Sequence, residues 1–275
     1  MFINVSIHCI DMKIVKEQIR KRVARSGNSG AVWVPKEWLG EEILVTRIEP
    51  PKLSLSEEVI NIVFPYLKGI SGVFLYGSYA RKEETKDSDI DILAIAESKF
   101  NLKNRKKFDI EIIETGKIKE AVQKNPFVYA IINESRPIFN NSLLNELRQS
   151  KKDFKEFINW FKETTRDSIK STKELIELDK LESSYLTSYS VIYSMILRLR
   201  GIFLIKSILK DEMFTNYSFK RFMLNYLSES EFKRVYIVYR SVRDNSKLKN
   251  IKIEMMIANK ILEVLEKEVD SLNAK

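Results

Sequence analysis

The sequence has very little of the two side chains on which many catalytic sites depend. Its 275 residues include one cysteine, Cys9, and one histidine, His8. This excludes a disulfide framework, a Cys/His zinc site and a Ser-His-Asp triad, and two adjacent residues are not expected to form a Cys-His dyad. Any catalytic metal therefore has to be held by carboxylates, which suits Mg²⁺ or Mn²⁺.

Long apolar runs are also missing. No stretch reaches the roughly 18 consecutive apolar residues that a membrane-spanning helix needs. The opening MFINVSIHCIDMKIV lacks the long apolar run and the small-residue cleavage pattern of a signal peptide. With a single cysteine fitting a reducing compartment, we predict a cytoplasmic protein with no membrane partner.

Charge is plentiful and unevenly divided between the two signs. Lys and Arg number 47 against 38 Asp and Glu, which gives a formal net charge of +9. Such an excess favours polyanionic partners such as nucleic acid or nucleoside triphosphates. A lysine-rich composition with no such partner would give the same number, so charge alone does not decide.

Three regions differ in pattern and predict an α+β multidomain protein. Residues 1–52 carry short β-type runs and end in the stiff pair Pro50-Pro51. Residues 53–142 alternate strand-like and helix-like segments, as in an α/β domain with a mixed sheet. In residues 143–275 apolar residues recur at helical spacing, with no proline and with Gly201 as the one glycine, which predicts a bundle of four or five helices.

The periodicity also predicts individual elements. In the first region it favours strands at residues 21–24, 31–34 and 43–48, with a turn cluster at 26–30. In the second it favours strands at residues 72–76, 90–96 and 108–113 and helices at 56–64, 118–124 and 127–133.

The end of the strand at residues 72–76 has the composition of an anion-binding turn. Gly77 lets the backbone approach a phosphate closely and present its amide groups at a helix start. Ser78 adds a hydroxyl group, and Arg81 follows about one helical turn later. These three residues are predicted to bind the phosphates of a nucleotide.

Acidic residues follow on the next two strands. Strand alternation places Asp89 and Asp91 on one face of the sheet, with Ile90 and Ile92 on the other. Carboxylates so close repel one another unless a cation lies between them, so a divalent metal that also contacts triphosphate oxygens explains the pair.

A third carboxylate has two candidates in the strand at residues 108–113. Asp109 and Glu111 share a face of that strand, and either could complete the site as metal ligand or general base. Two metal ions held by Asp89, Asp91 and Asp109 or Glu111 could activate an attacking oxygen and neutralise a leaving pyrophosphate. The sequence leaves the choice between Asp109 and Glu111 open.

These residues resemble the signature of nucleotidyltransferases of the DNA polymerase beta-like superfamily, a Gly-Ser turn followed by Asp-x-Asp. Tyr79-Ala80-Arg81 fits the wording of the minimal, antitoxin-type and kanamycin-nucleotidyltransferase-like branch, whereas Lys82 replaces its usual glycine. The resemblance covers roughly residues 55–141. It implies a triphosphate on Gly77 and Ser78, magnesium on Asp89 and Asp91, and a third acid at Asp109 or Glu111.

Residues 23–48 resemble the AbrB-type swapped-hairpin family through S-G-N-S and V-P-K-E-W-L-G. The resemblance implies a dimer that binds DNA through basic residues near the first hairpin. Those residues would be Arg20, Lys21, Arg22 and Arg25. A domain that only dimerises the enzyme is the alternative, and Trp33 and Trp38 are expected in the hairpin core.

The helical region from about residue 150 to 275 resembles the HEPN-type or kanamycin-nucleotidyltransferase-type bundle. Active HEPN ribonucleases carry an arginine followed by a histidine, and this chain has no histidine after His8, so we expect substrate or partner binding instead. Tyr185, Tyr189 and Tyr193 recur at helical spacing and either line an acceptor cleft or pack in the bundle.

The sequence thus predicts a Mg²⁺- or Mn²⁺-dependent enzyme that releases pyrophosphate from a nucleoside triphosphate. It would transfer a nucleoside monophosphate, with AMP as the expected group, to a hydroxyl acceptor. The alternative is a DNA-binding regulator or antitoxin-like protein with a vestigial transferase centre, and a third hypothesis is the modification of a protein partner. The sequence does not distinguish a protein, an RNA end or a small molecule as acceptor.

Overall fold

The computed structural model describes residues 19, 21–43, 45, 53–86, 88–100, 107–247 and 251–273. The chain divides into two compact units, Met1–Lys52 and Leu53–Lys275, which we describe separately. A further division into an α/β domain and a helical domain near residue 143 stays a prediction.

The N-terminal unit contains a short hairpin. Strands β1 (Ala24–Ser26) and β2 (Ser29–Ala31) pair antiparallel, and Gly27 turns between them with a φ of +60° that suits glycine. The strands lie closer to the turn than we predicted, because Ser26, Ser29 and Gly30 belong to the ladder and not to the turn. A single 3₁₀ turn, η1 (Lys36–Trp38), follows.

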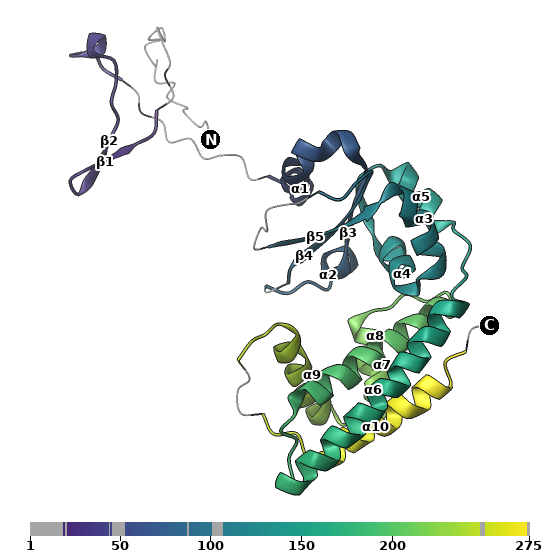
Figure 1. Ribbon diagram of the computed structural model, residues 1–275. Helices are drawn as coiled ribbons and strands as arrows, with labels where there is room; N and C mark the ends of the chain where they lie inside the picture. The colour runs from purple at the N-terminus through teal and green to yellow at the C-terminus, as the bar shows by residue number, and fades with distance from the viewer. Residues whose placement is uncertain are drawn as a thin grey trace, which may run out of the picture. The chain divides into compact units, whose positions relative to one another are not determined.

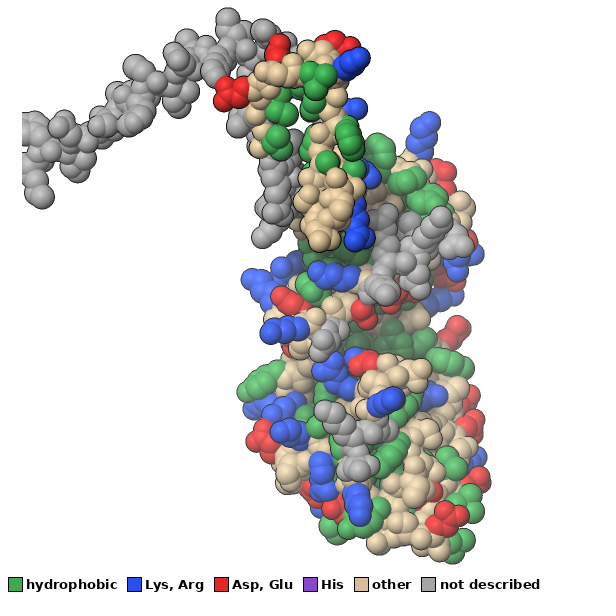
Figure 2. Space-filling model, turned by 90° about the vertical axis from the view of Figure 1, so that its left-hand side faces the viewer, with side chains coloured by type: hydrophobic (Ala, Val, Ile, Leu, Met, Phe, Trp, Pro, Cys, Tyr) green, Lys and Arg blue, Asp and Glu red, His purple; other side chains and the backbone are tan. Residues whose placement is uncertain are grey.

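Large apolar side chains of this unit remain exposed. Trp33 is 72% exposed and Leu39 is 76% exposed, and the prediction that Trp33 lies in a hairpin core is wrong for the single chain. None of residues 19, 21–43 and 45 is buried, and Figure 2 shows hydrophobic side chains along this unit. The third predicted strand, residues 43–48, lies mostly outside the described residues.

A four-stranded mixed sheet forms the centre of the second unit. Its strand order is β5-β4-β3-β6, with β3 antiparallel to β4 and β6 and with β4 parallel to β5. The strands are β3 (Ile70–Tyr76), β4 (Ile90–Ala96), β5 (Phe108–Glu114) and β6 (Arg136–Phe139). The mixed sheet and three of its strands confirm the prediction.

Helices cover both faces of this sheet (Figure 1). On one face, Val59 and Ile62 of α1 pack with Ile90 and Ile92 of β4. On the other face, Leu93 and Ile95 of β4 join a core that includes α3, α4 and α5. The helices are α1 (Leu55–Val63), which continues into η2 (Phe64–Gly69), α2 (Gly77–Arg81), α3 (Thr115–Lys124), α4 (Pro126–Glu134) and α5 (Asn141–Arg148).

Five helices make up the remainder of the described chain and confirm the predicted helical region. Helices α6, α7 and α10 run side by side (Figure 1), and α9 packs on α7. The helices are α6 (Lys155–Glu182), α7 (Tyr189–Leu209), α8 (Asn216–Met223), α9 (Glu229–Arg243) and α10 (Met255–Asp270).

The apolar core runs without a break from the sheet into these helices. Phe74 and Leu93 of the sheet belong to the same buried cluster as Ile158 of α6 and Ile196 of α7. Such a continuous core holds the bundle against the sheet and fixes their relative placement within this unit. Among the described residues, no helix combines the length and the apolar character that crossing a bilayer requires.

Candidate active site

The turn between β3 and α2 is the centre of the candidate site. Gly77 begins α2 with a φ of +70°, a conformation that favours glycine. A Cβ atom on Gly77 would lie 2.0 Å from Oδ2 of Asp91, so no larger residue fits. The turn therefore lies directly against the Asp91 carboxylate, with Ser78 half-buried as the next residue.

Asp91 and Asp109 lie beside each other on the parallel strands β4 and β5. They are register partners, so their side chains leave the sheet on the same face. Burial, followed by the charges of Asp109 and Asp89, raises the pKa of Asp91 to about 6, although Arg81 acts in the opposite direction. Asp89 is exposed one residue before β4, so the three predicted acids lie within electrostatic reach of one another.

Glu111 occupies a different place in the sheet. Its register partner is Leu93, two residues further along β4 than Asp91. The hydroxyl of Tyr76 donates a long hydrogen bond of 3.5 Å to its Oε2 atom. Burial, and then the charges of Glu111, Asp91 and Asp109, raise the pKa of Tyr76, so this phenol stays protonated beside the acids.

The acids offer the oxygen donors that a hard divalent cation prefers. In the part of the chain that the structure describes, no three acidic, histidine or cysteine side chains converge into a ready-made ion site. Mg²⁺ is commonly held by one or two carboxylates together with substrate phosphates. The crowded negative charge around Asp91 fits a cation that arrives with the phosphates of a nucleotide.

Arg81 lies between two carboxylates, one of which also holds the turn. Its Nη1 atom is 2.6 Å from Oε2 of Glu134, and its Nε atom is 3.0 Å from Oε2 of Glu83. The other oxygen of Glu134 accepts the backbone N–H of Gly77 at 2.9 Å. Burial would lower the pKa of Arg81, but these carboxylates outweigh burial and raise it. Glu134 thus binds both ends of α2, the backbone N–H of Gly77 at its start and the side chain of Arg81 at its end.

Glu134 is not among the site residues that the sequence predicts. This residue ends α4 and lies 57 positions after Gly77, and no motif links the two. The signal that could have drawn attention to it is a negative charge at the C-terminal end of a short apolar helix, where the helix dipole disfavours it. A carboxylate at such a position needs hydrogen-bond donors or a cation, and here Arg81 and the backbone N–H of Gly77 are its partners.

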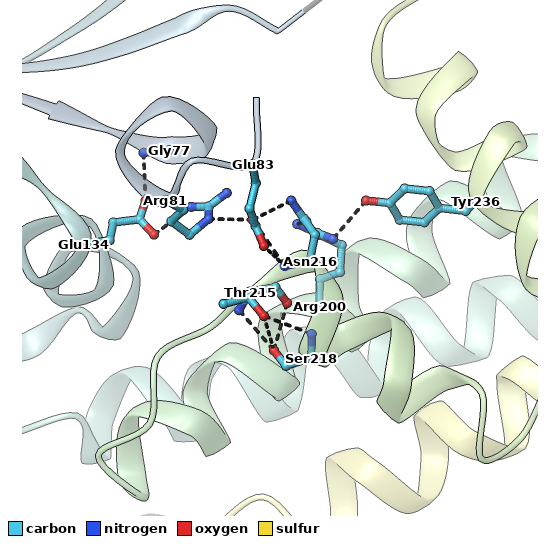
Figure 3. A network of polar contacts seen from close by, with 9 residues as sticks. All are labelled: Gly77, Arg81, Glu83, Glu134, Arg200, Thr215, Asn216, Ser218 and Tyr236. Atoms are coloured by element: carbon cyan, nitrogen blue, oxygen red, sulfur yellow. Dashed lines mark hydrogen bonds and ion pairs between the residues drawn. The ribbon is translucent and has the colours of Figure 1, made fainter. Parts of the chain in front are cut away.

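The contacts continue from Glu83 into the helical bundle (Figure 3). Oε1 of Glu83 accepts the backbone N–H of Asn216 at 3.1 Å, and Oε2 accepts its Nδ2 at 3.0 Å. The Oδ1 atom of Asn216 accepts from Arg200 of α7 at 3.0 Å, and Arg200 also donates to the hydroxyl of Tyr236 on α9 at 3.3 Å. A chain of polar contacts therefore joins the turn to the bundle.

Lys82 ends α2 in the left-handed conformation, with a φ of 60° and a ψ of 38°. Helices commonly end on glycine in this conformation, because a Cβ atom makes it unfavourable. This gives a physical reason for the glycine that usually follows the arginine in the turn motif. The backbone path is kept here with lysine in its place.

The basic residues predicted to bind DNA are only partly described. Arg20 lies outside the described residues. Lys21 and Arg22 precede β1, Arg25 lies within it, and all three side chains are exposed. The Nε atom of Arg25 donates to the carbonyl oxygen of Gly27 at 3.3 Å, which places this guanidinium at the hairpin turn.

Two family matches fall one in each compact unit. Residues 57–146 match the family Polymerase beta, Nucleotidyltransferase. This part of the chain is therefore similar to polymerase beta-type nucleotidyltransferases, as the turn and the acids predicted. Residues 11–50 match a family described as putative transposon-encoded protein (DUF2080).

Comparisons of the whole chain give a distant likeness. A solved structure of the spectinomycin adenyltransferase AAD(9) from Enterococcus faecialis, with ATP and spectinomycin, matches at 15% sequence identity and a TM-score of 0.42. The match covers 78% of this chain and 97% of that chain. No curated protein matches this sequence.

Proposed function

We propose that the protein is a metal-dependent nucleotidyltransferase. It would transfer a nucleoside monophosphate from a nucleoside triphosphate to a hydroxyl acceptor, and AMP is the group that we expect to be transferred. The observation that carries this proposal is the contact of Gly77 with Asp91. It puts a turn suited to phosphate directly against crowded acids, within a segment similar to nucleotidyltransferases.

The roles of the residues follow from their places. Gly77 and Ser78 would hold the phosphates through the amide groups of the turn and the serine hydroxyl. Asp89 and Asp91 would hold Mg²⁺ or Mn²⁺, which when bound neutralises phosphate charge in the displacement. Arg81 would act as a positioning residue, because Glu134 and Glu83 already occupy its guanidinium group.

Asp109 is our choice for the third acid. It is the register partner of Asp91 and, after burial, raises the pKa of that residue more than any other charge does, whereas Glu111 lies beside Tyr76. In the reaction the acceptor oxygen would bond to the α-phosphorus while the bond to pyrophosphate breaks. The hydroxyl proton would pass to an acid of this set, Asp109 in our assignment.

The test does not need the acceptor. Binding of ATP in the presence and absence of Mg²⁺ is measured by calorimetry, together with slow pyrophosphate release to water. We expect the double variant Asp89→Asn, Asp91→Asn to lose the Mg²⁺-dependent part of both signals while keeping its circular dichroism. Asp167→Asn, at an exposed position of α6, is the matched control. Unchanged Mg²⁺-dependent turnover in the double variant would refute the assignment.

We further propose that the N-terminal unit dimerises and binds DNA. Support comes from its exposed apolar side chains, such as Trp33 and Leu39, which a second copy could cover, and from the exposed Lys21, Arg22 and Arg25. In a gel-shift assay with the full chain, binding should weaken steeply with salt, and changing the three basic residues to Gln should flatten that dependence. A dimer without salt-sensitive DNA binding would leave dimerisation as the role of this unit.

A further inference from the structure

A cavity between α4 and the helical bundle is lined by none of the residues assigned to the proposed reaction. It measures about 470 Å³ and lies among α4, α6, α7 and the segment before α8. This volume falls within the range of small-molecule sites, about 300 to 1,000 Å³. Leu197, which lines the cavity, is 44% exposed, so the cavity reaches the surface.

Two arginines of α7, Arg198 and Arg200, line the cavity, and no acidic side chain does. Arg198 donates to the hydroxyl of Thr164 at 3.1 Å and lies over the ring of Phe161. Burial lowers the pKa of Arg198, and no neighbouring acid acts against that effect. Among the described residues neither arginine forms an ion pair, unlike Arg81, whose charge two carboxylates balance. Their positive charge is therefore available to a ligand.

Four of the residues that line the cavity are aromatic. Phe127, Phe161, Phe214 and Tyr193 line it, and the Arg200 guanidinium lies 5.0 Å from the centre of the Phe214 ring. Aromatic faces and guanidinium planes both accept a flat ligand by stacking. The chemistry of the walls suits a planar apolar body, and the chemistry of the arginines suits a negative group on it.

Gly201 explains how the aromatic wall is kept. Glycine inside a helix is less favourable than alanine, so its place in α7 calls for a reason. A Cβ atom there would lie 2.7 Å from Cζ of Phe161 and 3.3 Å from Cζ of Phe127. The missing side chain lets both rings close on α7 and form one side of the cavity.

We propose that this cavity is a binding site for a small aromatic anion, with Arg198 and Arg200 holding its carboxylate, sulfonate or phosphate group. The inference stands independently of nucleotidyl transfer, because it uses neither the Gly77 turn nor the acids. Arg200 also donates to Asn216, which bonds Glu83, so a ligand here would lie next to the contacts that hold the turn.

Two fluorescent probes that differ by one sulfonate group test the proposal on the full chain. They are 8-anilinonaphthalene-1-sulfonate and its neutral analogue N-phenyl-1-naphthylamine. We expect Arg198→Gln to weaken binding of the sulfonate about tenfold while changing binding of the neutral probe little. Arg198→Lys, which keeps the charge, should retain most of the affinity. The matched control is Arg166→Gln, because Arg166 lies exposed on α6 and forms an ion pair with Asp270.

A second variant covers the case in which Arg198→Gln does not fold. Leu197→Trp narrows the cavity from its exposed side and should weaken both probes. Exposed apolar groups elsewhere, such as Trp33, would bind both probes alike in every variant. The proposal is overturned if wild-type protein shows no preference for the sulfonate, or if Arg198→Gln and Leu197→Trp both leave its affinity unchanged. Because no turnover is measured, a failure here is separate from a failure of the proposed reaction.

Discussion

Replacing Glu134 by Gln tests whether one carboxylate fastens both ends of α2. Glutamine keeps the size of the side chain and can still accept the Gly77 amide, but it offers an N–H₂ group where Arg81 needs an acceptor. Breaking a buried ion pair on one side costs about 3 to 5 kcal/mol. Arg81 keeps Glu83 as a second partner, so we expect a smaller loss of about 2 kcal/mol in the free energy of unfolding.

A double-mutant cycle makes this expectation specific. Arg81→Gln should cost more than Glu134→Gln, because it leaves Glu134 and Glu83 both without their cation. If the pair acts as one unit, the double variant should be about 1 to 2 kcal/mol more stable than the sum of the single losses predicts. Urea unfolding followed by far-UV circular dichroism measures this, because every α-helix of the described chain lies in Leu53–Lys275.

The control for this cycle is Glu146→Gln. Glu146 lies on α5 and is exposed, and its Oε1 atom is 3.6 Å from Nζ of Lys119. Replacing it should therefore lower the free energy of unfolding by less than about 0.5 kcal/mol. Mg²⁺-dependent ATP binding adds a second measurement, which should weaken about tenfold in Glu134→Gln and not in the control. Equal unfolding losses in Glu134→Gln and Glu146→Gln, or strictly additive losses in the cycle, would refute the role of Glu134.

Three further predictions concern single positions. Lys82→Gly should raise the free energy of unfolding by about 0.5 to 1 kcal/mol, because it relieves a left-handed residue, and a loss of stability in urea would contradict this. Asp109→Asn should reduce Mg²⁺-dependent turnover far more than Glu111→Gln, and the reverse order would make Glu111 the third acid. Asp179 accepts four hydrogen bonds from Thr187 and Ser188, which outweigh burial and lower its pKa. Its stabilisation is therefore present above the unfolded pKa and lost as pH falls through the folded one, so Asp179→Asn should cost about 2 kcal/mol at neutral pH and little in strong acid.

Local patterns were enough to predict three of the four strands of the sheet and the acids on two of them. Strand β4 is apolar on both sides of Asp91, and its bounds match the predicted range of residues 90–96, because buried strands give strong local signals. The hairpin strands were predicted a few residues too far from their turn, since Ser and Gly read as turn residues while the ladder includes them. Helix α7 begins at Tyr189, so Tyr185 does not continue its stripe, and Tyr193 alone of the three tyrosines lines the cavity.

What the sequence could not predict depends on contacts between distant residues. The register of β4 and β5 places Asp109 and not Glu111 beside Asp91. This register depends on how the two strands pair in space, which the local sequence of either strand does not contain. Glu134 reaches Gly77 across 57 positions, and Asn216 reaches Glu83 across 133. The periodicity of the sequence does not indicate these long-range hydrogen bonds, because each partner is an ordinary polar or glycine residue in its own segment.

These distant contacts change how the bundle should be regarded. From the sequence alone, the helices after residue 143 are predicted to form a bundle separate from the catalytic domain. The structure runs one apolar core through both and joins Arg200 of α7 to the Gly77 turn through Asn216, Glu83, Arg81 and Glu134. Each link is a hydrogen bond or ion pair in a half-buried setting, where losing one partner leaves the next unpaired. The geometry of the Gly77 turn therefore depends on helices that carry none of the proposed catalytic acids.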